Sequence, residues 1–313
     1  SFGCFSVKPQ ILHDSKQGLW LCYRHVETNH YWWSTLQNNP VIGRVIKNKY
    51  MYRLISILLS IVLFGCSHAP ETGRSQFIAI SQSQELQLGN DAYAEVLQEE
   101  SIVTSGPQFE MVQRVGEKVA TAANRLYPDV VAGYQWKFSL IRDNDMVNAW
   151  ALPGGKCAVY TGLLPVTENE DALAIVMAHE VAHVIARHGA ERSSHAMLSA
   201  VVAGIAMSEM DETDRLLVLA AYGVGVALPF SRTQETEADQ LGLYISADAG
   251  YDPREAIPLW ERMGKAGSKA PAEFLSTHPT SETRIKQIQG WMPKAMMYYD
   301  NSVAHEAAQS PSN

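Results

Sequence analysis

The feature that most constrains this chain is an apolar segment, residues 172 to 184, with polar residues inside it. The segment reads ALAIVMAHEVAHV, and its only polar side chains are His179, Glu180 and His183. Its length and composition predict a buried helix. Burying two histidines and a glutamate without partners would be costly. We therefore expect these three side chains to share a partner inside the protein.

The spacing of the two histidines suits a metal ion. Residues four apart on an α-helix lie on one face, one turn apart, so His179 and His183 can bind the same cation. Zinc accepts imidazole nitrogen at about 2.0–2.1 Å. Glu180 follows the first histidine and would lie beside a water on the metal. The motif is short and also arises by chance on surface helices, but here its apolar surroundings favour a buried zinc site.

A third ligand has to come from elsewhere in the chain. Catalytic zinc has three protein ligands and one open position, and Gly189 stands where a third histidine of an extended motif would be. The best candidate is Glu235, near the start of a predicted helix. Asp239 lies on the same face and can accept a hydrogen bond from a ligating imidazole. Glu237 is rotated by about 200° and is the weaker candidate. The alternative is a solvated acidic helix start, which the helix dipole favours.

The rest of the pattern predicts an α+β fold, mostly helical, with a small β-sheet beside the histidine helix. Apolar residues from Phe109 to Ala122 recur at helical spacing. Strands are expected over 134–141 and 158–161, and a loop over 148–155 in which Gly154 and Gly155 mark a turn.

Three further expectations concern the histidine helix and the residues after it. Thr167 and Glu170 form a capping box that opens the helix. His188 lies half a turn away from the ligand face, so we expect it to be structural. The apolar stretches 196–207 and 216–230 are too short to span a bilayer. We interpret them as buried helices, or as a lid that touches a membrane or substrate.

The beginning of the chain predicts a leader. Residues 1–50 lack methionine and any apolar period, so we expect a non-native upstream extension rather than a real cytoplasmic one. From Met51 the chain reads MYRLISILLSIVLFGCS, and residues 51–65 are typical of a signal peptide because the apolar run is too short for a permanent membrane anchor. The last residues resemble a lipobox, with Cys66 as the lipidation site. The alternative is a plain signal peptide with an incidental cysteine.

These features predict where the protein is located in the cell and how its segments are ordered. Ser67 after the cysteine favours a bacterial cell-envelope protein, a periplasm-facing outer-membrane lipoprotein held by a lipid anchor. Residues 67–80 would be a tether, 81–292 the catalytic domain and 293–313 a flexible tail.

Composition narrows the function classes. After residue 65 the chain has 18 Lys and Arg against 31 Asp and Glu, a charge near −13, which argues against a nucleic-acid partner. With Cys66 acylated, Cys157 is the one cysteine left after the leader, so no intramolecular disulfide is available. Cys157 alone also cannot supply a structural zinc site, which usually has four protein ligands.

Taken in order, the motifs resemble a known family, the zinc peptidases typified by HtpX and the CaaX prenyl proteases. The resemblance rests on His179-Glu180-x-x-His183, on the E-x-x-A-D pattern of 235–239, on Asn148-Ala149 followed by 153–155, and on 276–279 with Arg284 downstream. It spans most of residues 80–292. Soluble lipoprotein members of the Oma/LoiP (YggG-like) type are the most similar, and a zincin-like domain is implied.

The resemblance implies roles for two more residues. His278 corresponds to the family's histidine near the metal, which either stabilises the oxyanion or masks the zinc in a resting state, and Arg284 would assist with its charge. The alternative is a capped turn with a surface arginine.

The predicted activity is endopeptidase cleavage of misfolded or unassembled envelope proteins. One zinc ion per chain would activate water, with Glu180 as general base. The backbone of Asn148, Ala149 and Trp150 would pair with an extended protein or peptide substrate, although Trp150 suits a core equally well. The alternative function is a periplasmic chaperone or assembly factor for outer-membrane proteins, with proteolysis gated or secondary.

Overall fold

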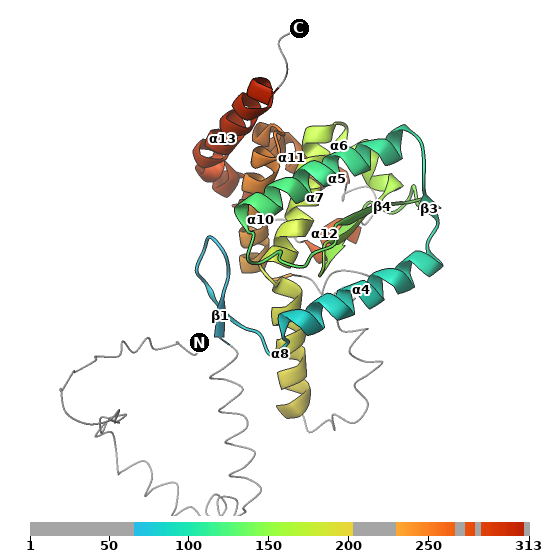
Figure 1. The fold of residues 1–313 in the computed structure, drawn as a ribbon, viewed down its shortest axis with the longest axis vertical. Coiled ribbons are helices and arrows are strands. Elements are labelled where there is room, and N and C mark those ends of the chain that lie inside the picture. The colour runs from blue at the N-terminus through green and yellow to red at the C-terminus, as the bar shows by residue number, and fades with distance from the viewer. Residues whose placement is uncertain (1–65, 203–229, 267–272, 279–282, 310–313) are drawn as a thin grey trace, which may run out of the picture. The chain divides into compact units, whose positions relative to one another are not determined.

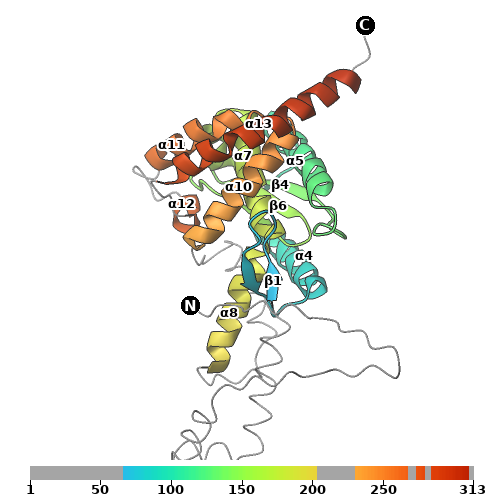
Figure 2. The same ribbon diagram turned by 90° about the vertical axis from the view of Figure 1, so that its left-hand side faces the viewer.

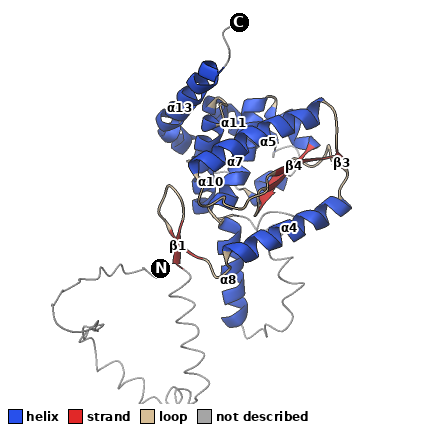
Figure 3. Ribbon diagram, in the orientation of Figure 1, coloured by secondary structure: helices blue, strands red, loops and turns tan. Residues whose placement is uncertain are grey.

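A computed structural model describes residues 66–202, 230–266, 273–278 and 283–309, and from Ser67 on these form one compact unit. Helices make up most of this part, and the strands gather in two small sheets (Figure 1, Figure 3). The predicted α+β, mostly helical class is confirmed. Across the described ranges, none of the helices combines the length and hydropathy needed to span a membrane.

The larger sheet has four strands in the order β3-β4-β6-β5. Strands β4 (Lys137–Ile141) and β6 (Lys156–Tyr160) run parallel, whereas β3 (Ile102–Val103) and β5 (Ala149–Leu152) pair antiparallel with them. Strands β5 and β6 are buried at every position, so both faces of the sheet are covered. The smaller sheet pairs β1 (Cys66–His68) with β2 (Ser75–Phe77).

Helices α4 (Gln82–Glu99) and α5 (Pro107–Leu126) cover opposite faces of the large sheet. Successive strand residues point to opposite faces. Ser139 of β4 hydrogen-bonds Tyr93 of α4 at 2.7 Å, and its neighbour Phe138 packs on Gly116 of α5. Helix α7 (Glu170–Ile185) packs beside α5 and against β5, so the histidine helix adjoins the sheet as predicted.

The described residues after α7 are mainly helical, and helices α8 (His188–Val202), α10 (Arg232–Asp248) and α11 (Ala256–Ala266) contact α7. Helix α10 packs along both α7 and α13 (Arg284–Gln309), and α11 contacts α7 and α13 (Figure 2). Helix α8 follows α7 after a sharp turn, and α12 (Glu273–Thr277) is a short element before His278. Short helical turns, η1 and α6 (Thr161–Leu163, Leu164–Thr167) and η3 (Pro253–Glu255), complete the described part.

Several predicted boundaries differ from those observed. The helix over 109–122 is confirmed as α5, and the turn at Gly154 and Gly155 is confirmed by their positive φ of 85° and 79°. The predicted loop 148–155 is wrong in part, because it contains β5. Its four residues are all buried, so no polar alternation marks them as a strand.

The predicted helix start is also wrong. Thr167 ends α6, and its hydroxyl donates to the Leu164 carbonyl. The N-cap of α7 is Asn169, whose side chain accepts a hydrogen bond from the Ala172 amide. Residues 293–309, expected as a flexible tail, belong to α13, where Lys294 pairs with Glu71 at 2.8 Å. Of the predicted stretches 196–207 and 216–230, residues 196–202 belong to α8, whereas residues 203–207 and 216–229 lie outside the described residues, as does the leader.

Candidate metal centre

Helix α7 carries the two histidines and the glutamate into the interior. His179, Glu180 and His183 are each at most 3 % exposed. The Nε2 atoms of His179 and His183 lie 3.1 Å apart, so both rings point to one place, as the spacing predicts. Burial lowers the pKa of both histidines, although neighbouring carboxylates oppose it. The rings are therefore neutral, with lone pairs available to a cation.

Helix α10 brings Glu235 to the same place. Its start is fixed by a capping box between Ser231 and Gln234, which puts Glu235 in the first turn. The carboxylate oxygens of Glu235 lie 3.4 Å from His183 Nε2 and 3.6 Å from His179 Nε2. Burial alone would raise the pKa of Glu235, but the charge of His278 and the close approach of His278 and His183 hold it well below its usual range.

His278, directly after α12, completes the cluster. Its Nδ1 lies 2.9 Å from a Glu235 oxygen and 3.3 Å from His179 Nε2. One donor atom from each of His179, His183, Glu235 and His278 lies within 4.8 Å of the others. Imidazole nitrogens together with a carboxylate oxygen form a donor set that suits zinc. The residues present therefore fit a metal ion at this point.

Glu180 lies at the edge of this cluster with a free oxygen. Its Oε1 is buried and makes no hydrogen bond, and His278 Nε2 lies 3.4 Å from it. Burial raises the pKa of Glu180 to about 7, although the charge of His278 opposes the rise. A carboxyl group with a pKa near neutrality suits a general base.

Asp239 and Arg284 support the cluster from behind. Asp239 Oδ1 lies 3.1 Å from His179 Nδ1, close in distance although the ring N–H is not well aligned with it. Arg284 bonds the same Asp239 oxygen at 2.6 Å, reaches Glu235 at 3.5 Å and lies over the ring of Trp260. The structure thus places Arg284 on these carboxylates.

The residues predicted to pair with substrate lie in or beside the terminal strand β5. Ala149 and Trp150 belong to β5, and Asn148 directly precedes it. The Trp150 side chain is 1 % exposed and packs edge-on against Tyr93, so it belongs to the core. A substrate contact here would use the backbone. Cys66 begins β1, and its lipidation stays a prediction.

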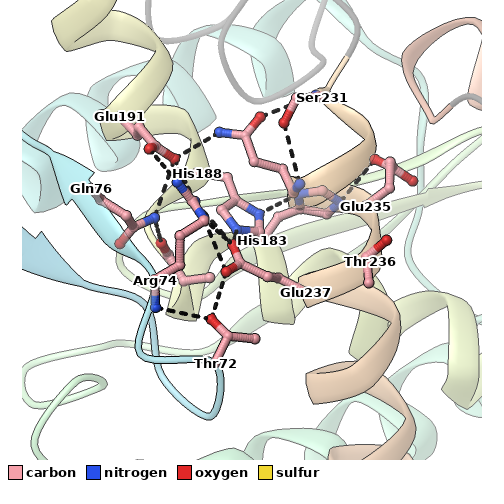
Figure 4. A network of polar contacts seen from close by, with 12 residues as sticks. Thr72, Arg74, Gln76, His183, His188, Glu191, Ser231, Glu235, Thr236 and Glu237 are labelled. Carbon is pink, nitrogen blue, oxygen red and sulfur yellow. Dashed lines mark hydrogen bonds and ion pairs between the residues drawn. The ribbon is translucent and has the colours of Figure 1, made fainter. Parts of the chain in front are cut away.

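A polar network missed by the sequence reasoning surrounds the far side of His183 (Figure 4). His188 contacts His183, and Glu237 joins His188 to Arg74 of the segment between β1 and β2. The sequence offered a weak indication of it, the position of Glu237 opposite Glu235 on α10.

The fold and this centre define a metal-dependent peptidase of the zincin-like kind. Comparison with known proteins agrees, since the profile of Peptidase family M48 matches residues 107–292. The chain belongs to this family and is a metalloendopeptidase.

Similar proteins include the mitochondrial metalloendopeptidase OMA1 of Schizosaccharomyces pombe, 36% identical over 240 residues, which cover 75% of this chain and 69% of that protein. OMA1 of Saccharomyces cerevisiae is 33% identical over 265 residues, 78% of this chain and 76% of the relative. The beta-barrel assembly-enhancing protease of Escherichia coli is 29% identical over 233 residues, 69% of this chain and 45% of the relative.

These relatives correct one prediction. The bacterial outer-membrane address is contradicted, because the yeast, plant and animal relatives are mitochondrial proteins. The predicted location depends on the leader and on Ser67, and a short apolar leader carries little information about the organism that uses it.

Proposed function

We propose that this chain is a zinc-dependent endopeptidase that cleaves misfolded or unassembled proteins at internal peptide bonds. The observation that carries the proposal is the buried cluster of four donor atoms with the unbonded carboxylate oxygen of Glu180 beside it. His179, His183 and Glu235 would hold one zinc ion. When bound, zinc would act as a Lewis acid that polarises the scissile carbonyl and acidifies the attacking water.

Glu180 is the proposed general base. It takes a proton from the attacking water and delivers it to the departing amine. In the metal-free protein the pKa of its carboxyl group is about 7, a value that suits both steps near neutral pH. Asp239 lies beside Nδ1 of His179, and Arg284 holds Asp239, so we assign both a supporting role.

We propose that His278 masks the metal in a resting state. Its Nδ1 lies within the donor set, so it is placed to serve as a fourth protein ligand. Sites with four protein ligands are typically structural, and catalytic sites leave one position open. We therefore favour the masking role over oxyanion stabilisation, with His278 leaving the centre when substrate binds.

Substrate would bind along β5. This strand ends the sheet order and pairs with β6, and among the described residues no strand pairs with its other edge. An extended peptide can add to such an edge through its main chain. Main-chain pairing tolerates many side chains, which suits a peptidase for unfolded segments.

The proposal is tested with Glu180→Gln in the full chain, by zinc content and casein cleavage. Glu170→Gln is the matched control, because Glu170 begins the same helix and pairs with Arg114 at the surface. We expect one zinc per chain in all three proteins and a loss of cleavage of about 100- to 10,000-fold in Glu180→Gln alone. Full zinc with undiminished cleavage in Glu180→Gln would overturn the mechanism.

The alternative function is an assembly factor in which proteolysis is secondary. The name of the Escherichia coli relative, a protease that enhances β-barrel assembly, favours keeping it. An assembly factor would retain its activity on unfolded clients in Glu180→Gln, measured as suppression of client aggregation. If the protein acts as a peptidase, Glu180→Gln should no longer degrade these unfolded clients.

A further inference from the structure

His188 is fully buried beside the metal centre, yet it lies outside the donor set. Its Nδ1 is 2.9 Å from Nδ1 of His183, and its Nε2 is 3.0 Å from Oε2 of Glu237. The rings of His183 and His188 meet edge to face, with centroids 5.0 Å apart. His188 therefore bridges the outer nitrogen of a proposed ligand and a carboxylate (Figure 4).

A break in the helix makes this contact possible. Five residues along a continuous helix amount to about 500°, so His188 would point about 140° away from His183. Helix α7 instead ends at Ile185, and Arg187 adopts a positive φ of 54°. Arg187 is held there by Glu85 at 2.8 Å and by the Ile80 carbonyl at 3.0 Å. The turn returns His188 to His183.

The positions of the protons give the hydrogen bonds from His183 through His188 to Glu237 a direction. The Nε2 of His183 faces the donor cluster, so its lone pair must be free for a metal and its Nδ1 must carry the proton. That N–H can donate only if Nδ1 of His188 is unprotonated. His188 then carries its proton on Nε2 and donates it to Glu237. Each donor finds an acceptor in this one arrangement.

Glu237 is itself held firmly in place. It accepts hydrogen bonds from the Thr72 hydroxyl at 2.6 Å and from Arg74 Nε and Nη2 at 3.0 and 2.9 Å. Arg74 also bonds both oxygens of Glu191 on α8, at 2.6 and 2.8 Å. The carboxylate that orients His188 is thus tied to the segment between β1 and β2 as well as to α8.

We propose that His188 is a positioning residue for the metal centre: it accepts the Nδ1–H of His183, fixes that ring, and links it to the carboxylate of Glu237. Metal-bound histidines commonly donate their other N–H to a carboxylate or carbonyl. Here a second histidine stands between ligand and carboxylate. This inference rests on the proposed metal site.

The test measures the zinc dissociation constant of the full chain by chelator competition, together with the melting temperature of the zinc-free protein. His188→Phe keeps the ring volume and removes both nitrogens. We expect zinc binding about 10- to 100-fold weaker. A wild-type chain that binds no zinc would overturn both this inference and the proposed function. A His188→Phe protein with wild-type zinc affinity would overturn the inference alone.

Two amide variants separate positioning from simple packing. The side-chain oxygen of His188→Asn can take the place of Nδ1 and accept from His183. The amide of His188→Gln reaches the place of Nε2 and can donate to Glu237 but leaves His183 unpaired. We expect Asn to recover part of the zinc affinity that Phe loses and Gln to recover less. Equal affinities for the two amides would contradict the proposal.

Glu237→Gln tests the last hydrogen bond of this series, the one between His188 and Glu237. Asp248→Asn is its matched control. Asp248 also lies on α10 and bonds an arginine of another helix, Arg125, at 2.6 Å. We expect weaker zinc binding for Glu237→Gln only. In the zinc-loaded wild type, ¹⁵N NMR should show His188 protonated at Nε2 and unprotonated at Nδ1. The opposite tautomer would refute the proposed direction of the hydrogen bonds.

Discussion

Gly242 of α10 packs directly on the backbone of His179 of α7. A Cβ at position 242 would lie 2.8 Å from both the nitrogen and the Cα of His179. This close approach of the two helices is what allows Glu235, two turns earlier on α10, to reach the histidine pair. The metal centre therefore depends on a residue without a side chain.

We expect Gly242→Ala to push α10 away from α7. Overpacking of this kind costs about 1–3 kcal/mol of unfolding free energy, and the separation of Glu235 from the histidines should weaken zinc binding as well. Gly290 is the control, because it lies exposed in α13, where an added Cβ would have no atom within 4 Å. Gly290→Ala should be neutral or stabilising by up to about 1 kcal/mol. Equal denaturation midpoints for both variants would contradict this account.

His278→Ala distinguishes the two roles of His278. If His278 masks the metal, its removal should weaken zinc binding by a factor on the order of 10 and leave casein cleavage at or above the wild-type rate. If it stabilises the oxyanion, cleavage should fall while zinc affinity stays constant. Zinc dissociation constants and initial cleavage rates, measured at saturating zinc, decide between them.

Glu180 gives the zinc-free protein a characteristic pH dependence. Its folded pKa of about 7 exceeds the ordinary value of 4.5, mainly because of burial. Between these values the folded chain binds more protons than the unfolded chain, so stability falls as the pH rises. The shift corresponds to roughly 3 kcal/mol at pH 8.

Glu180→Gln removes this titration. Without metal, we expect the variant to be more stable than the wild type at pH 8, by up to roughly 3 kcal/mol, with the difference vanishing near pH 4.5. Urea unfolding in the presence of a chelator measures it. A constant difference between the two proteins across this range would show that Glu180 titrates normally in the fold.

The sequence predicted the part of the site that depends on regular helices. His179 and His183 share a face of α7, and Glu235 and Asp239 share a face of α10, because helical periodicity fixes both relations. That the two helices meet at this point could not be read from the sequence, since it depends on tertiary packing.

His188 shows where such reasoning fails. The prediction that His188 is structural requires a continuous helix, and the positive φ of Arg187 shows that the helix is broken before it. Arginine seldom adopts this conformation, and here it is held by Glu85, about a hundred residues earlier in the chain. Strand β5 was missed for a related reason, because burial on both faces removes the alternation that marks a strand.

The most direct test of the account is anomalous diffraction at the zinc edge from crystals of the full chain grown with zinc. The account predicts one peak per chain, about 2.0–2.2 Å from Nε2 of His179, Nε2 of His183 and an oxygen of Glu235. No peak at this position, or a peak that Glu235 does not contact, would contradict it.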